Sequence, residues 1–368
     1  MIRREFLQKA AAGLLLMSFG SGVYSIMHSA NQQVQPEELP DTISRTEADM
    51  LSLAFRAPSG HNTQPWQIKV LEPGRWLLET VKERWLPAVD PLNREMYLSL
   101  GAFIANLKTA GRLYGQQVEV QLVAEDFFDT AVAFVQLYPV QPERDENILK
   151  EMQLRRTLRS GYLPHEITPE DVSYLTGGLP EIIYYSPASQ EGRWLADGTI
   201  AANRQQVFHD DAQRELADWI RWSAKEAAVH RNGLTPESME LPMLARWYAK
   251  AFFDQTSVMQ QSFRESTVAK VQEQVGCSGG WLIISSKDST IASLLQAGEI
   301  FGELSLKARA RQIALQPMMQ ILEEQPWKEQ IAAQLSLTGN AQFIVRTGYV
   351  KGYPEPVSLR MGLSQIVY

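Results

Sequence analysis

The chain has 368 residues, of which 45% are hydrophobic and 21% charged, and its formal net charge is -7. This composition is typical of a globular protein with a packed core, and the length fits two domains or one large one. Because nucleic-acid binders are usually basic overall, the acidic balance argues against that class, and we expect no nucleic-acid partner. The single cysteine, Cys277, cannot form an intramolecular disulfide or a cysteine-based metal cluster, and we expect no metal site. It is interpreted as a small buried residue, with a redox thiol as the alternative.

The first residues have the pattern of an export signal. Arg3 and Arg4 precede an apolar run from Ala10 to Val23, and small residues follow near Ser25. This run is too short and too weakly apolar for a membrane span. The paired arginines resemble a twin-arginine signal, so we expect residues 1–30 to engage the twin-arginine translocation machinery and direct the protein to the periplasm. Two alternatives stay open: an ordinary amphipathic first helix, and an uncleaved anchor that holds the protein at a membrane.

The elements expected after this signal begin with a polar linker at residues 31–43. Helical periodicity then runs from Ser44 to Phe55, and Ser44 and Glu47 have the spacing of a capping box. Further elements follow in the order strand 67–71, strand 76–80, helix 98–113, strand 118–123 and strand 132–138. Together these elements predict a first unit over residues 44–142.

A second unit is predicted over residues 143–368, after a charged junction at 143–150. Its expected elements are strand 182–185, helical stretches 191–225 and 237–256, strand 281–285, a long helix 291–313, strand 341–350 and a proline-containing tail 352–368. Both units alternate helices with strands, which indicates a duplicated unit.

A turn-forming loop lies between the first helix and the first strand. Pro58, Ser59 and Gly60 force a turn that leaves backbone N–H groups free, and Asn62 and Gln64 add neutral donors and acceptors. Such a loop suits a flat heteroaromatic ring whose edge carries donors and acceptors. The alternative is a well-capped loop above a buried tryptophan.

Three further segments carry polar or basic chemistry in the second unit. Arg155, Arg156, Thr157 and Arg159 lie within five residues, which suits a phosphate clamp or, alternatively, a solvated basic helix face. Residues 315–319 are expected to end the long helix at a proline, either as a binding turn or as a plain helix end. The tail segment 354–363 contains Arg360.

These segments resemble the nitroreductase family. The pattern of residues 58–66, PSxxNxQPW, is similar to that family's flavin-ring loop, and 155–159 resembles its RRSxR motif, with Thr157 in place of serine. The resemblance implies FMN as cofactor, and a backbone N–H of Met319 or Gln320 at the reactive N5 of its ring. A basic residue returns to the phosphate from the family's C-terminal arm, and here Arg360 matches it. The residues implied to bind FMN are Pro58, Ser59, Gly60, Asn62, Arg155, Arg156, Thr157, Arg159, Pro317, Met318, Met319, Gln320 and Arg360.

The motifs are divided between the two units in a complementary way. The first unit has the ring loop without a phosphate motif, and the second has the reverse. Nitroreductases are usually homodimers with FMN at the interface, so the chain resembles the Acg-type branch, whose members are fused pseudo-dimers. The implied fold is α+β and nitroreductase-like, with two tandem half-units forming an intrachain pseudo-dimer around FMN. A stretch at 84–91 also looks like that branch.

The implied function is that of an exported FMN-dependent oxidoreductase. It transfers two electrons as hydride through FMN to a small-molecule acceptor such as a nitroaromatic or a quinone. No general acid or base is recognisable in the sequence, so no catalytic residue is assigned. Two alternatives stay open: a flavin-sequestering protein with a lidded site and no turnover, and a membrane-associated redox partner. The aromatic and methionine-rich residues 227–263 are either a core stripe or that lid.

Overall fold

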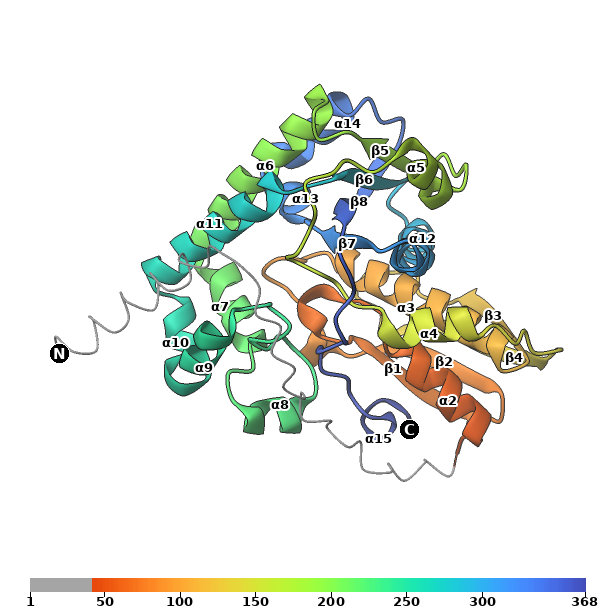
Figure 1. The fold of residues 1–368 in the computed structure, drawn as a ribbon. Coiled ribbons are helices and arrows are strands. Elements are labelled where there is room, and N and C mark those ends of the chain that lie inside the picture. The colour runs from red at the N-terminus through yellow and green to blue at the C-terminus, as the bar shows by residue number, and fades with distance from the viewer. Residues whose placement is uncertain (1–41) are drawn as a thin grey trace.

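The computed structural model describes residues 42–368 (Figure 1). It contains two four-stranded antiparallel sheets, with strand orders β1-β2-β4-β3 and β5-β6-β8-β7, and helices pack on both. Each sheet lies within one half of the chain, which confirms the predicted α+β class with two half-units. The predicted signal, residues 1–30, and the linker up to residue 41 lie outside the described residues.

The first unit contains every element predicted for it. Its elements are α2 (Arg45–Ala54), η1 (Gly60–Asn62), β1 (Trp66–Glu72), β2 (Arg75–Thr80), η2 (Lys82–Arg84), α3 (Arg94–Leu113), β3 (Gln116–Leu122) and β4 (Ala131–Pro139). The capping box of α2 is present, because Glu47 N–H donates to Ser44 Oγ at 3.2 Å and Ser44 N–H donates to Glu47 Oε2 at 2.7 Å. Helix α3 begins earlier than predicted, because Asp90 Oδ2 accepts the Met96 N–H at 2.9 Å and caps its first turn.

The second unit is richer in helices than predicted. It contains α4 (Glu146–Leu154), α5 (Pro169–Thr176), β5 (Ile182–Tyr185), α6 (Gln190–Phe208), α7 (Asp210–Trp219), α8 (Ala224–His230), α9 (Met243–Phe252), α10 (Gln255–Val258), α11 (Gln261–Gly276), β6 (Gly280–Ser286), α12 (Ile291–Ala310), β7 (Ile313–Pro317), α13 (Gln320–Glu323), α14 (Trp327–Gln334), β8 (Asn340–Tyr349) and α15 (Leu363–Ile366). The stretch predicted as helical over 191–225 is three helices. One break lies at Ile220, where Leu234 N–H donates to Trp219 O and Arg221 N–H donates to Leu234 O.

The prediction that one helix runs from Ile291 and ends at 315–319 is wrong. Helix α12 ends at Ala310, Gln312 adopts a left-handed φ of 56°, and the chain turns into strand β7. The apolar run Ile313–Leu315 is buried because it pairs with β8, not because it continues the helix. Since β7 is the edge strand of the second sheet, Pro317 is tolerated at its end.

Helices α3 and α12, one from each unit, pack against each other at backbone contact (Figure 1). A Cβ atom on Gly101 would lie 2.1 Å from Leu295 O, and one on Gly298 would lie 2.2 Å from Leu98 O. Only glycine permits this approach at either position. One hydrophobic core cluster includes strand residues of both sheets, so the two units are packed as a single body.

The C-terminal tail crosses from the second unit to the first. Val70 N–H donates to Tyr368 O at 2.8 Å, and Tyr368 N–H donates to Ile68 O at 3.0 Å, so the last residues extend the edge of the first sheet beside β1. These hydrogen bonds are a second connection between the two units, in addition to the packing of α3 on α12. The predicted boundary between residues 142 and 143 stays a prediction. Within residues 42–368, no helix combines the length and apolar character needed to cross a membrane.

We expect Gly298→Ala to lower the free energy of unfolding by about 3 kcal/mol, because its methyl group forces α3 and α12 apart. The matched control is Gly276→Ala at the end of α11, where no atom lies within 4 Å of the added Cβ. That change should be neutral or stabilise by up to about 1 kcal/mol. Chemical denaturation of both variants measures the difference, and equal effects would contradict the role assigned to the crossing.

Candidate functional site

The predicted ring loop has an unusual backbone. Three of its residues, His61, Asn62 and Gln64, have positive φ values of 46°, 55° and 53°. Ser59 Oγ accepts the Gln64 N–H at 3.0 Å and closes the turn. Non-glycine residues hold such conformations only where their surroundings enforce them, and ligand sites are common places for this.

The second unit supplies the contacts that hold this loop. Asn62 Nδ2 donates to Gly233 O at 3.0 Å and to Leu359 O at 3.1 Å, while Gly233 N–H donates back to Asn62 O at 3.0 Å. Gln64 Nε2 donates to Arg231 O at 3.0 Å, and Gln64 Oε1 accepts the Met361 N–H at 2.9 Å. The Asn62 amide is therefore bonded to protein groups. A contact from it to FMN stays a prediction and would compete with these bonds.

A group of guanidiniums without a counter-charge lies beside the loop. Arg155 Nη2 and Arg360 Nη2 both donate to Arg56 O, at 2.7 and 3.2 Å, and Arg360 Nη1 donates to Asn62 Oδ1 at 2.6 Å. Burial lowers the pKa of Arg155 to about 10, and burial together with Arg155 and Arg56 lowers the pKa of Arg360 to about 9. The buried Nε of Arg155 has no partner. This group, Arg56, Arg155 and Arg360, fits a phosphate dianion.

A carboxylate of the chain itself, Glu240, contacts the other two arginines of the predicted clamp, Arg156 through its guanidinium and Arg159 through its backbone N–H. The Arg159 guanidinium donates to Ser238 O at 3.2 Å. Arg156 Nη2 lies 2.9 Å from Glu240 Oε1, and the exposed fractions of these side chains are 6% and 11%. The Arg159 N–H and Ser160 Oγ donate to Glu240 Oε2 at 3.1 and 2.6 Å. The predicted clamp therefore has two parts. Sequence analysis missed Glu240, because no local pattern links it to residues lying 80 positions away.

The ring loop and the clamp face each other. Burial and the nearby Arg159 charge lower the pKa of His61 to about 4, so this imidazole is neutral at pH 7. Thr157, between the clamp arginines, is half-buried. The structure therefore brings together the loop, the clamp and Arg360, although they come from distant parts of the sequence.

The predicted turn at 317–320 lies at the end of β7 and the start of α13. Met318 is buried and donates its backbone N–H to Ile344 O at 2.8 Å, whereas Met319 and Gln320 are half-buried. Of the turn residues, Met319 and Gln320 thus remain the candidates for a backbone contact to a ring. Helix α13, which follows this turn, connects it to the ring loop. Glu323 of α13 is hydrogen-bonded to Glu95, and Glu95 Oε2 lies 3.9 Å from the Cβ position of Gly60.

Glu95 of α3 and Glu323 of α13 form a carboxyl pair across the two units. Burial raises the pKa of both groups, and Glu323 raises that of Glu95 further. Arg94 Nη2, 3.3 Å from Glu95 Oε1, opposes this shift, and Gln206 donates to Glu323. Both shifts favour the protonated form of these carboxyls. The pair is a candidate proton donor that sequence analysis missed, because its members come from different units.

The methionine- and aromatic-rich segment divides into two kinds of surface. Phe253 and Phe263 of this segment pack against Trp222 in a small core, so the core-stripe interpretation fits those two residues. It is wrong for Leu244 and Trp247 of α9, whose exposed fractions are 67% and 68%. The contacts to the ring loop and clamp come instead from residues 231–240, which precede α9.

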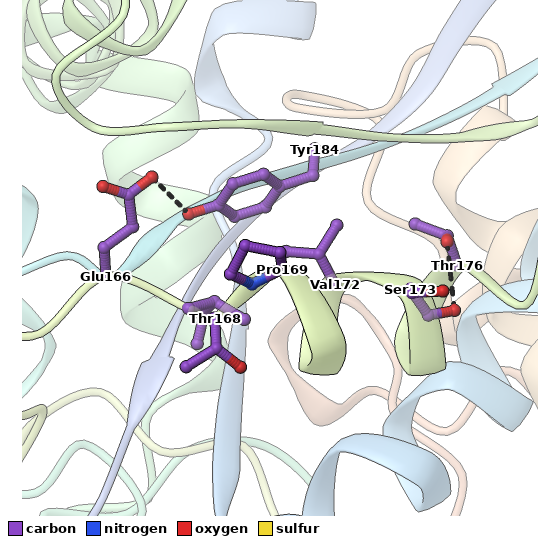
Figure 2. A pocket seen from close by; sticks show the side chains of 8 residues that line it. Glu166, Thr168, Pro169, Val172, Ser173, Thr176 and Tyr184 are labelled. Carbon is purple, nitrogen blue, oxygen red and sulfur yellow. Dashed lines mark hydrogen bonds between the residues drawn. The ribbon is translucent and has the colours of Figure 1, made fainter.

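A separate pocket of about 750 Å³ lies between α5 and β5 (Figure 2). Figure 2 shows Tyr184 and Glu166 at its rim, where Tyr184 Oη donates to Glu166 Oε1 at 3.2 Å. None of the predicted FMN-binding residues lines it.

We expect the carboxyl pair to make stability depend on pH. Because folding raises the pKa of the pair, its contribution to the free energy of unfolding is full below about pH 4.3, the pKa of a glutamate in the unfolded chain. This contribution is lost as the pH rises through the pKa of the folded protein. Glu95→Gln removes this titration, so the stability of wild type relative to the variant should fall as the pH rises above about 4.3. Unfolding free energies across that range test this, with Glu329→Gln at an exposed position of α14 as the control. Parallel pH profiles for wild type and Glu95→Gln would show that the pair does not hold the proton.

Several known proteins are similar to this chain in sequence. No protein-family model matches the chain. A Mycobacterium tuberculosis protein named "putative NAD(P)H nitroreductase" is 24% identical over 333 residues, covering 88% of this chain and 91% of its own length. The M. tuberculosis "putative NAD(P)H nitroreductase acg" is 24% identical and covers 86% and 94%. The "probable NAD(P)H nitroreductase PigM" of a Serratia strain is 23% identical and covers 86% and 92%.

Among solved structures, the FMN-dependent nitroreductase NfnB from Mycobacterium smegmatis, in complex with NADPH, aligns with a TM-score of 0.37 and 16% identity. The alignment covers 60% of this chain and 96% of NfnB. The sequence matches extend over most of this chain and nearly all of each relative. By those matches, the chain is a distant homologue of proteins named putative NAD(P)H nitroreductases, acg among them.

Proposed function

We propose that this protein is an FMN-dependent oxidoreductase of nitroreductase type that binds one FMN per chain between its two units. The observation that carries this proposal is the uncompensated group Arg56, Arg155 and Arg360 directly beside the ring loop. Arg155 is buried and Arg56 and Arg360 are half-buried, and no carboxylate among residues 42–368 forms an ion pair with any of them. Placing these guanidiniums together is costly, and a phosphate dianion would remove that cost. The names of the relatives support the same reaction class.

Different residues are proposed to bind different parts of FMN. Arg155 and Arg360 hold the phosphate, with Arg56 behind them, and Pro58, Ser59 and Gly60 lie along the ring. The backbone of Met319 or Gln320 would contact the ring edge. FMN, when bound, supplies hydride transfer to a small acceptor such as a nitroaromatic or a quinone. The Glu95 carboxyl, beside Gly60, holds the proton that a reduced acceptor takes up.

A flavin-sequestering function is the second candidate. The observation that favours it is the closure of residues 231–240 over the loop and clamp. The reciprocal bonds between Asn62 and Gly233 and the Glu240 contacts hold that segment in place. A segment bonded this firmly excludes water and slows the access of an acceptor. Turnover therefore depends on whether this segment opens.

We expect purified protein to carry one FMN per chain, visible in its absorption spectrum. Each charge-assisted contact to the phosphate contributes about 1.5–3 kcal/mol, so Arg155→Met or Arg360→Met should weaken FMN binding about tenfold to over a hundredfold. Arg214→Met, at an exposed position of α7, is the control and should bind as wild type. A double variant that stays fully loaded would contradict the assignment.

The same preparation separates the two candidate functions. Bleaching of the flavin band by NADPH, followed by reoxidation with a nitroaromatic or quinone, supports the oxidoreductase. Fully bound flavin that no donor or acceptor reaches supports sequestration.

We also propose that the protein is exported to the periplasm by the twin-arginine machinery. The support is the paired arginines before the short apolar run 10–23. Replacing Arg3 and Arg4 by lysine should leave the protein in the cytoplasm, whereas Lys9→Arg should not. Cell fractionation measures both variants, and recovery of wild type in the membrane fraction would indicate an uncleaved anchor. Unchanged export of the double-lysine variant would mean a different route.

A further inference from the structure

Helix α9 turns its apolar side toward solvent. Its large side chains that are each more than half exposed are Met243, Leu244, Trp247 and Phe252. Met243, Trp247 and Ala251 are spaced four residues apart, so they form one row along the helix, with Leu244 beside it. Only Ala249 of α9 is buried, so the helix contacts the core through one narrow side. A surface helix normally has the opposite arrangement, with its apolar side facing the core.

Two cations border this apolar row. Arg246 and Lys250 each follow a member of the row by three residues, and α9 contains no Asp or Glu. Within residues 42–368, Arg246 forms no ion pair, and its Nε has no hydrogen-bond partner. Lys250 Nζ lies 2.6 Å from Glu237 Oε1, and both side chains are partly exposed. The helix therefore presents an apolar surface with positive charge along one edge.

The region around α9 is also less acidic than the rest of the chain. Residues 221–260, which contain α8, α9 and α10, have five basic and four acidic residues, whereas the whole chain has a net charge of -7. One of the four acidic residues, Glu240, is paired with Arg156 of the clamp. Figure 1 shows these three helices on one side of the molecule, away from both sheets. An anionic surface would therefore meet little repulsion here.

A bilayer surface fits these features. Helix α9 has 10 residues, whereas a helix that crosses a bilayer needs about 20, so α9 can only lie along the membrane. The rings of Trp247 and Phe252 contact each other with centroids 6.4 Å apart, which makes a continuous aromatic surface. Aromatic and aliphatic residues on one side, with Lys and Arg beside them, are typical of helices that lie in the interface of anionic membranes.

A second copy of the chain fits this surface less well. In a twofold-symmetric dimer the same patch faces itself, so Arg246 and Lys250 of both copies would meet. Glu237 balances only one cation of each copy, and α9 supplies no carboxylate. Asp254, just past the end of α9, accepts hydrogen bonds as the cap of α10. Lipid phosphates would supply the negative charge that such a dimer lacks.

We propose that α9 binds the protein to the surface of a membrane that contains anionic lipids. Met243, Leu244 and Trp247 insert at the level of the headgroups, while Arg246 and Lys250 lie against lipid phosphates. Their methylene chains stay beside the apolar row and their charged ends stay in the polar layer. This inference goes beyond the proposed function and does not require bound FMN. Because residues 231–240 contact the ring loop and lead into α9, docking would hold that part of the site near the membrane.

Flotation of the full chain with lipid vesicles tests this proposal. Wild type should bind vesicles of phosphatidylglycerol and phosphatidylcholine about tenfold to thirtyfold more tightly than vesicles of phosphatidylcholine alone, since each cation near the lipid contributes about 1 kcal/mol. Leu244→Gln with Trp247→Gln should weaken binding to the mixed vesicles at least about tenfold. Arg246→Gln with Lys250→Gln should remove the preference for the anionic lipid. A wash in high salt should release protein held by α9, whereas an uncleaved anchor would resist it.

The matched control is Leu92→Gln with Phe128→Gln, which removes two exposed apolar side chains of the first unit and should bind as wild type. Met243→Gln is a single exposed change that should also weaken binding, and it keeps the proposal testable if a double variant fails to fold. Unchanged binding by the α9 variants would assign the contact to another part of the chain, such as the apolar run 10–23, and would overturn the inference.

Three other results would also overturn it. The first is wild type that binds neither kind of vesicle. The second is binding to polyglutamate without binding to vesicles, which would indicate an acidic protein partner. The third is a dimer, seen by sedimentation, that Leu244→Gln with Trp247→Gln abolishes, together with no vesicle binding, which would make this surface an interface between copies. Each of these results leaves the proposed function standing, because flavin binding is measured separately.

Discussion

The close crossing of α3 and α12 is the constraint on which the rest of the structure depends. At Gly101 and Gly298 the two helices touch backbone to backbone, and this sets the distance between the two sheets. The ring loop follows α2 in the first unit, whereas the clamp, the turn and Arg360 belong to the second. Their separation therefore depends on how closely these helices approach. Glu95 lies near the start of α3 and reaches Glu323 of the other unit, so the carboxyl pair depends on the same crossing.

Local features of the site follow from the sequence, whereas its long-range partners do not. The capping box at Ser44 and Glu47 and the turn at Pro58 to Gly60 are encoded within a few residues, and a pattern can reveal them. The contact of Glu240 with Arg156 joins distant segments, and no spacing rule anticipates it. The sequence predicts the end of a helix where strand β7 lies, because a short buried apolar run has the same pattern in a helix and in a strand. Only its pairing with β8 separates them.

Charge balance explains why the clamp divides into two parts. The region contains five arginines, Arg56, Arg155, Arg156, Arg159 and Arg360, and Glu240 forms an ion pair with one of them, Arg156. Glu240 offsets one of the two positive charges on the side formed by Arg156 and Arg159, and its ion pair with Arg156 holds residues 231–240 beside the clamp. The side formed by Arg155 and Arg360 keeps its excess positive charge. A phosphate dianion bound there would still leave the region positive, so cofactor binding and closure by Glu240 are electrostatically compatible.

Whether phosphate and Glu240 can be bound at the same time determines whether the site opens when the cofactor binds. If Glu240 had to leave before phosphate could bind, loading would open the segment, and a loaded site would be accessible to an acceptor. If phosphate binds to Arg155 and Arg360, it does not compete with Glu240 for Arg156, and opening of residues 231–240 then depends on their own hydrogen bonds to Asn62 and Gln64. Those bonds are to backbone carbonyls of Gly233 and Arg231, whose exposure to solvent on opening costs little. Residues 231–240 are thus held against the ring loop and the clamp by several hydrogen bonds and one buried ion pair.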